Sequence, residues 1–136
     1  NRRRHLKPRA HQNRGEPIMW LSIAAVSGAL AIAAGAFGAH GLRDRVTPDQ
    51  VAAWSTAAQY QLIHSAVLLG LALYAMGPER SIRLPGALFL IGIVLFSGSI
   101  YLLVLTPWRW LGPVTPIGGL FFIAGWLSLF TLARNQ

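Results

Sequence analysis

Hydrophobic residues in this chain of 136 residues are gathered into four blocks that short polar segments separate. The blocks cover about residues 18–39, 57–76, 84–105 and 114–133. Each is about 20 residues long, and a helix of that length spans the roughly 30 Å hydrocarbon core of a bilayer. Because apolar residues run continuously instead of alternating, the blocks predict helices and not barrel strands. We therefore expect an all-α protein, an integral membrane four-helix bundle over residues 18–136.

The segment before the second block carries a helix start signal. Thr47 is a favourable N-cap, Pro48 suits the first helical position, and Asp49 places a negative charge in the first turn. We expect a short helix, residues 48–55, to lie along the membrane interface before the second span begins near Ala57.

Half of the basic residues lie at the N-terminus of a chain whose net charge is +8. They are Arg2, Arg3, Arg4, Lys7, Arg9 and Arg14. We interpret residues 1–17 as an extra basic arm that contacts anionic lipid headgroups or an acidic protein surface, and not nucleic acid, because a span follows directly. Arg80, Arg83 and Arg134 fall on the same side of the membrane as the arm, against Arg43, Arg45 and Arg109 on the other. The positive-inside rule then places both termini in the cytoplasm, and we expect a bacterial inner membrane.

Small residues recur in the predicted spans at spacings that let helix backbones approach closely. Since lipid tails are as apolar as leucine, helices in a bilayer associate through such close packing and through polar contacts. We predict helix packing at Ser27, Ala31, Gly35, Gly38, Gly70, Gly98, Gly118 and Gly119. The simplest interpretation is packing within one bundle, and oligomerisation through the same faces is the alternative.

Neutral polar side chains inside the blocks form the candidate site, namely His40, Tyr60, Gln61, His64, Ser97, Ser99, Tyr101 and Thr115. Tyr60 and Gln61 precede His64 by four and three residues, so all three share one helix face. The predicted topology gathers the set in the outer half of the bilayer, with His64 about 10 Å below the surface. A histidine at membrane depth is a functional-site hypothesis. The simpler interpretation is interhelical hydrogen bonding, worth about 0.6 kcal/mol per contact.

Several classes of chemistry are excluded or disfavoured by what the chain lacks. It has no cysteine, which excludes disulfides, iron–sulfur clusters and thiolate zinc sites. All four acidic residues (Glu16, Asp44, Asp49 and Glu79) lie outside the blocks, which argues against proton or cation coupling. No catalytic set of residues is recognisable, so we expect no enzyme and no resident cofactor.

Four ordered motifs give the chain a family resemblance. They are GAFGAHGL at residues 35–42, TAAQYQ at 56–61 with His64 after it, LFSGSIY at 95–101, and LGPVTPIGGL at 111–120 followed by Gly125 and Trp126. Together they resemble the YgdD-type family of small inner-membrane proteins, a domain of unknown function with animal relatives. The resemblance covers about Met19 to Leu132 and implies four transmembrane helices and no established activity. The first eighteen residues have no counterpart in that family pattern.

We favour a non-catalytic membrane protein that serves as an accessory or scaffolding subunit of a larger membrane complex, with lipids and other membrane protein subunits as partners. One alternative is a haem-, metal- or lipid-binding protein in which His40 and His64 supply ligands. Two imidazoles suffice for haem but make an incomplete metal site. Another alternative is a small neutral-solute transporter, which would require a polar path through the apolar cytoplasmic half.

Overall fold

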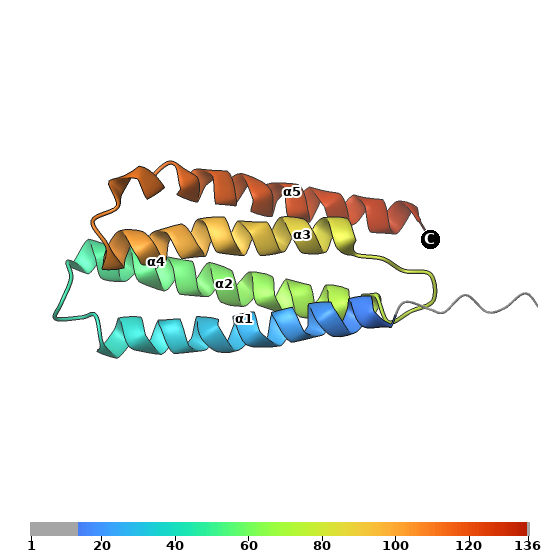
Figure 1. Ribbon diagram of the computed structural model, residues 1–136, viewed down its shortest axis with the longest axis horizontal. Coiled ribbons are helices and arrows are strands. Elements are labelled where there is room, and N and C mark those ends of the chain that lie inside the picture. Colours follow the sequence, from blue (N-terminus) through green and yellow to red (C-terminus); the bar gives the residue numbers. More distant parts are fainter. Residues whose placement is uncertain (1–13, 136) are drawn as a thin grey trace, which may run out of the picture.

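The computed structural model describes residues 14–135, which form four long helical rods lying side by side (Figure 1). The first two rods are α1, Gly15–His40, and α2, Pro48–Tyr74. The third consists of α3, Arg83–Gly92, the π-helical segment η1, Ile93–Ser97, and α4, Gly98–Leu105. A 3₁₀ turn, η2, Arg109–Leu111, precedes α5, Val114–Arg134, which is the fourth rod. The start of α1 and the end of α5 lie at the same end of the bundle, here called the terminus end.

Three helical segments are long and apolar enough to cross a membrane, as judged by length and composition. They are Gly15–His40, Arg83–Leu105 and Arg109–Arg134. Large apolar side chains such as Leu30 on α1 and Phe130 on α5 point outward, which suits a lipid environment. An all-helical fold with three such segments is therefore confirmed for the described residues. The fourth crossing, by α2, stays a prediction, because polar residues dilute the apolar character of that helix.

The helix α2 begins at the predicted cap but does not break where the sequence suggested. Thr47 Oγ1 accepts a hydrogen bond from the Gln50 backbone N–H at 3.2 Å, and Gln50 Oε1 accepts one from the Thr47 N–H at 3.0 Å. This capping box starts a helix that then runs unbroken for 27 residues. The prediction of a separate interfacial helix over residues 48–55 is wrong. These residues form the first two turns of α2, since no glycine or proline follows Pro48 to interrupt them.

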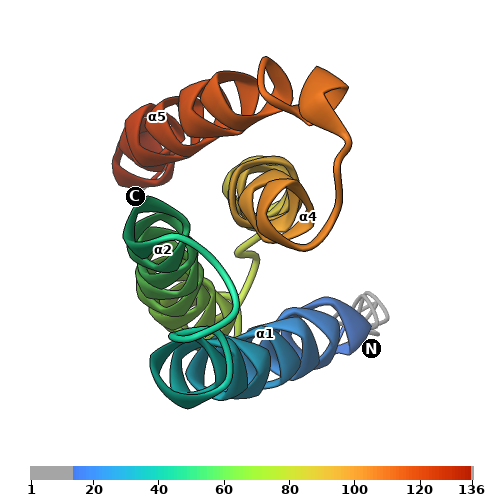
Figure 2. The same cartoon turned by 90° about the vertical axis from the view of Figure 1, so that its left-hand side faces the viewer.

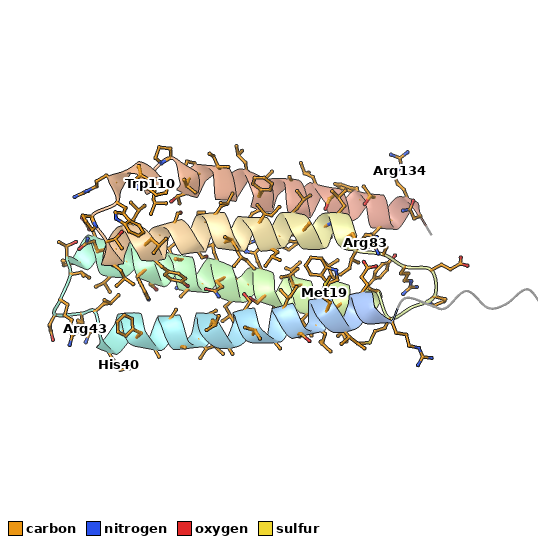
Figure 3. The ribbon with its side chains drawn as sticks, viewed as in Figure 1. Met19, His40, Arg43, Arg83, Trp110 and Arg134 are labelled. Atoms are coloured by element: carbon orange, nitrogen blue, oxygen red, sulfur yellow. The ribbon has the colours of Figure 1, made fainter. Side chains whose placement is uncertain are left out.

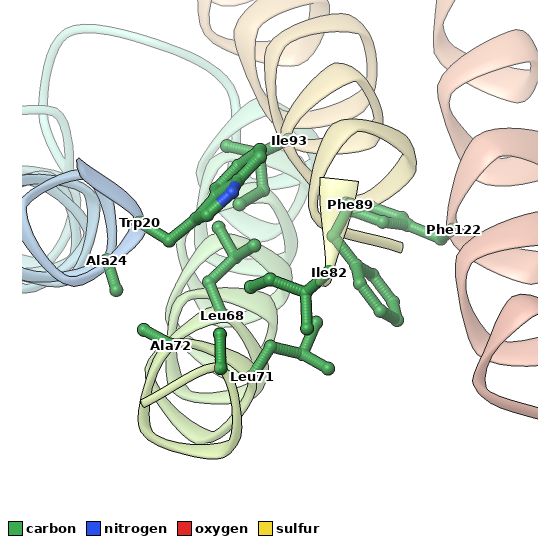
Figure 4. Close-up of a cluster of buried hydrophobic side chains, with 10 residues drawn as sticks. Trp20, Ala24, Leu68, Leu71, Ala72, Ile82, Phe89, Ile93 and Phe122 are labelled. Atoms are coloured by element: carbon green, nitrogen blue, oxygen red, sulfur yellow. The ribbon is translucent and has the colours of Figure 1, made fainter. Parts of the chain in front are cut away.

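Viewed along the bundle, α1, α2 and α5 lie around an open curve, and the third rod lies on its inner side (Figure 2). The helix α1 packs mainly on α2, and α5 packs mainly on α3 and η1. The two pairs are joined by α2, which contacts η1 and α4. A hydrophobic cluster fills the space between them, with Trp20 from α1, Leu68 from α2, and Phe89 and Phe122 from the second pair (Figure 4).

Glycines admit the closest helix contacts, although not at every predicted position. At Gly118 a Cβ atom would lie 2.3 Å from the Phe96 backbone nitrogen in η1, and at Gly38 it would lie 2.4 Å from the Trp54 ring. Around Gly70 and Gly98 there is open space, so these two are not at close helix contacts. The remaining members of the predicted set lie between these extremes. Ser27 and Ala31 are buried, and Gly35 and Gly119 make ordinary contacts at 4.0 Å.

Basic side chains mark both ends of the bundle (Figure 3). Arg83 and Arg134 lie at the terminus end, and Arg43 lies at the opposite end with the exposed ring of Trp110. Five of the predicted arm contacts, Arg2, Arg3, Arg4, Lys7 and Arg9, lie outside the described residues. Arg14 immediately precedes α1 and is exposed.

Candidate functional site

A buried glutamine joins three of the helices. Gln61 Oε1 accepts a hydrogen bond from the Tyr101 hydroxyl at 2.7 Å, and Gln61 Nε2 donates to the Ser27 carbonyl oxygen at 3.1 Å. Gln61 therefore links α2 to α4 on one side and to α1 on the other. Both the oxygen and the nitrogen of its carboxamide are hydrogen-bonded, as a buried amide requires.

The same contact region holds two serine hydroxyls. Ser65 Oγ lies 2.7 Å from Ser27 Oγ and 2.6 Å from the Gln61 carbonyl oxygen. All three residues are buried. Ser65 was not predicted as a site residue, and Ser27 was predicted only as a packing residue. The available signal was the four-residue spacing of Gln61 and Ser65, which places both on one helix face.

Both ring nitrogens of His64 are occupied by hydrogen bonds. Nδ1 lies 2.7 Å from the Tyr60 carbonyl oxygen, and Trp126 Nε1 donates to Nε2 at 3.2 Å. Because a carbonyl can only accept, we assign the single ring proton to Nδ1 and the lone pair to Nε2. The ring also stacks on Phe122, with ring centroids 3.7 Å apart. His64 is only 4% exposed and holds α2 against α5.

Hydroxyl groups make two further ties between rods. Ser97 Oγ of η1 donates to the Ala57 carbonyl oxygen of α2 at 2.7 Å. Ser99 Oγ of α4 and Thr115 Oγ1 of α5 lie 2.6 Å apart. Ser97, Ser99 and Thr115 were all predicted to belong to the candidate site, and each of them bonds to a residue of another rod.

Trp54 extends the network to the far end of α1. Its ring lies against that of Tyr101, with centroids 4.5 Å apart, and its Nε1 donates to the Ala34 carbonyl oxygen at 2.7 Å. Tyr60 lies on the neighbouring side of α2, where its half-exposed ring stacks on Phe96 at 4.7 Å. Trp54 and Trp126 were not predicted as site residues, and Trp126 was noted only as part of the fourth family motif.

His40 does not join the cluster. The hydrogen bonds of Trp54 to Ala34 and of Gln61 to Ser27 fix the antiparallel register of α1 and α2. Six residues beyond Ala34, His40 lies level with Pro48 and is exposed. His64 is sixteen residues further along α2, or about 24 Å away. Two axial imidazoles must bind opposite faces of one iron atom, so His40 and His64 do not fit a shared haem.

The cluster lies near the middle of the bundle. Gln61 is the middle residue of α2, and His64 and Ser65 lie beyond it toward the terminus end. The predicted depth of His64 rested on a span beginning near Ala57, whereas α2 begins at Pro48. The polar contacts therefore extend from the end of the bundle opposite the termini to its centre.

A carboxylate that no prediction singled out secures the terminus end. Glu16 accepts hydrogen bonds from the Ser81 hydroxyl at 2.9 Å and from the Ile82 backbone N–H at 3.0 Å, and Arg83 Nε lies 3.6 Å away. Ile82 is the N-cap residue of α3, where unpaired N–H groups favour a negative charge. Glu16 thus fastens the start of α1 to the start of α3.

The described residues gather no group of three or more His, Asp or Glu side chains that could hold a metal ion. A cavity of about 270 Å³ opens at the terminus end, lined by Tyr74, Glu79, Arg80, Leu132, Asn135 and two loop residues. Because Glu79 and Arg80 have opposite charges, the lining has no net preference for anions or cations.

Comparison with known proteins relates most of the chain to uncharacterised membrane proteins. Residues 34–119 match the family described as "Protein of unknown function (DUF423)". A "UPF0382 membrane protein" of Staphylococcus epidermidis is 41% identical over 111 residues, covering 82% of this chain and 91% of that protein. The UPF0382 membrane protein YwdK of Bacillus subtilis is 37% identical over 117 residues, covering 85% and 95%. A UPF0382 membrane protein of Schizosaccharomyces pombe is 40% identical over 114 residues, covering 79% and 95%. No solved structure matches the chain.

Proposed function

The chain belongs to the DUF423 family of membrane proteins of unknown function, and from that premise we propose that it is a non-catalytic accessory or scaffolding subunit of a larger membrane complex. The proposal includes four crossings of the membrane, with both termini in the cytoplasm of a bacterium. The resemblance to the YgdD-type family, its animal relatives and the bacterial inner membrane stay predictions, since the three relatives described above come from bacteria and a yeast.

The observation that carries the proposal is that the polar side chains at the centre of the bundle are hydrogen-bonded to other groups of the chain. The Gln61 side chain is hydrogen-bonded to the Tyr101 hydroxyl and the Ser27 carbonyl oxygen. The His64 ring is hydrogen-bonded to the Tyr60 carbonyl oxygen and to Trp126 Nε1. A catalytic site needs a nucleophile, a base or a ligand that is free to meet a substrate. Side chains that bond across helices instead stabilise a membrane bundle. This arrangement supports a structural role.

The register of the helices supports a fourth crossing by α2. It runs antiparallel to α1, and its polar residues Gln61, His64 and Ser65 are buried against neighbouring rods. Polar groups satisfied inside a bundle do not oppose insertion as they would on an isolated helix. Four crossings agree with the position of both described ends at the terminus end, where Arg83 and Arg134 suit a cytoplasmic surface.

The two alternative functions gain no specific support. A haem held by His40 and His64 does not fit the register of α1 and α2. Passage of a neutral solute would require polar groups free to meet it, whereas Gln61, His64 and the Ser99–Thr115 pair are engaged with each other or with neighbouring helices.

The proposal is tested by isolating the native assembly. The full chain with a C-terminal tag is extracted from its own membrane in a mild detergent, and blue-native electrophoresis is followed by mass spectrometry of the band. We expect other membrane protein chains at a fixed ratio to this one. A band that contains this chain alone overturns the accessory role.

A further inference from the structure

A second glutamine of α2 faces away from the bundle. The Gln59 side chain is exposed, in contrast to the buried Gln61 two residues later. By the register of α1 and α2, Gln59 lies level with Ala29, close to the middle of both helices. Its Nε2 donates to Ser55 Oγ at 3.4 Å, and within residues 14–135 its Oε1 accepts no hydrogen bond.

An amide in this position is costly in lipid. Hydrocarbon offers no hydrogen-bond partners, so an oxygen without a donor and an N–H with only a long contact are both poorly satisfied. In water the same groups would be solvated. If α2 crosses the membrane as proposed, Gln59 therefore favours any arrangement that gives it a protein partner.

The exposed side of α2 around Gln59 carries both large and small residues. Leu62 and Ile63, one turn after Gln59, are 43% and 53% exposed, and small residues lie before and beyond them. Ala52, Ser55, Ala66 and Gly70 lie on the same side of α2 and are exposed. With Gln59 they form what we call the outer face of α2. A Cβ atom on Gly70 would meet nothing within 4 Å. Small residues flanking a polar one are typical of helix–helix interfaces in membranes.

The helix α2 thus has polar residues on two opposite sides. Gln61, His64 and Ser65 face the bundle, and Ser55 and Gln59 face away from it. A helix that is polar on both sides is stable in lipid when both are covered. Figure 2 shows α2 at the edge of the curve of rods, with its outer side uncovered by the rest of the chain.

We propose that a second copy of this chain covers the outer face of α2, so that the two form a dimer about a two-fold axis through Gln59. Two copies inserted in the same orientation place identical residues at the same depth. A two-fold contact brings each such residue to its counterpart. A carboxamide has both donors and an acceptor, so two Gln59 side chains satisfy each other across the axis. This inference rests on the four crossings of the proposed function and names a contact by which the chain assembles.

The absence of native cysteine makes the contact directly testable. The full chain is prepared with one cysteine at a time, as Gln59→Cys, Ala52→Cys or Ala66→Cys on the outer face. The controls are Leu30→Cys on α1 and Ile123→Cys on α5, which are both 57% exposed. Membrane vesicles are oxidised and analysed by non-reducing electrophoresis. We expect covalent dimers from the three outer-face positions and much less from the two controls.

A second variant measures the role of the amide itself. Gln59→Leu is expected to weaken dimerisation about fivefold to thirtyfold, the range for a polar contact between model transmembrane helices. Dimerisation is measured by energy transfer between labelled chains in vesicles at several protein-to-lipid ratios. The control is Ser22→Ala, which removes an exposed hydroxyl from α1 and should leave dimerisation unchanged.

The outcomes separate this inference from the proposed function. Equal cross-linking at outer-face and control positions, or no effect of Gln59→Leu, overturns the dimer. Cross-linking of the outer face to a different polypeptide also overturns it but leaves the accessory role standing. A self-cross-linked dimer whose native band contains no other chain supports this inference and overturns the accessory role.

Discussion

The Tyr101 hydroxyl donates a hydrogen bond to Gln61 Oε1 at 2.7 Å, which joins two helices through residues forty positions apart in the chain. Gln61 also reaches Ser27, so a single amide connects α1, α2 and α4. Removing a partner from such a buried group costs more than the bond itself, because the remaining atom is left without water or a donor.

Tyr101→Phe should therefore destabilise the protein by about 1 kcal/mol. Gln61→Leu should destabilise it by about 2 kcal/mol, because this change also leaves the Ser27 carbonyl oxygen without the Gln61 donor. The free energy of unfolding is measured in mixed detergent micelles. Tyr60→Phe is the matched control, since the Tyr60 hydroxyl makes no hydrogen bond within the described part of the chain and its loss should change stability by less than about 0.5 kcal/mol. Equal effects at the two tyrosines would contradict the role of the Gln61 contact.

Trp126→Phe should remove the donor to His64 Nε2 while keeping an aromatic ring against Phe89. We expect a loss of about 1 kcal/mol in the free energy of unfolding. Trp110→Phe is the control, because Trp110 is 68% exposed at the opposite end of the bundle. A stability unchanged by Trp126→Phe would show that His64 does not depend on this bond.

Gly118→Ala should destabilise the contact of α5 with η1. Its Cβ atom would lie 2.3 Å from the Phe96 backbone nitrogen, which cannot move aside as a flexible side chain can. Overpacking of this kind costs about 1–3 kcal/mol. The control Gly98→Ala enters open space within a helix and should be neutral or stabilising by up to about 1 kcal/mol. The thermal unfolding midpoint should therefore fall with Gly118→Ala and stay unchanged or rise with Gly98→Ala.

Glu16→Gln should weaken the link between the start of α1 and the start of α3. The amide keeps an acceptor for Ile82 N–H but loses the negative charge near Arg83, so we expect a loss of about 0.5–1.5 kcal/mol. Hydrogen exchange at the Ile82 amide should also become faster. Glu79→Gln, an exposed change in the adjoining loop, serves as the control and should leave both measurements unchanged.

The fourth crossing is tested by accessibility of single cysteines. Asp44→Cys should react with a membrane-impermeant maleimide from one side, and Glu79→Cys and Asn135→Cys from the other. This pattern follows if α2 and the two later rods each cross the bilayer. Labelling of positions 44 and 79 from the same side would show that α2 does not cross.

The sequence by itself determined the helices, because its signals are local. Continuous apolar runs of the right length require helices in lipid, and Thr47 and Pro48 place the start of α2 without reference to any other segment. The residue types of the polar contacts could also be recognised, since Gln61, His64 and Tyr101 are unusual inside apolar blocks.

Only the tertiary structure decided which of these residues meet. The pairing of Gln61 with Ser27 and of His64 with Trp126 depends on the register of helices that are distant in the chain, and local periodicity contains no such register. The same register separated His40 from His64, although both had seemed equally placed to bind a ligand. The contact of Trp54 with the Ala34 carbonyl oxygen of α1 was likewise decided only by the tertiary structure, because no local signal in the sequence reveals it.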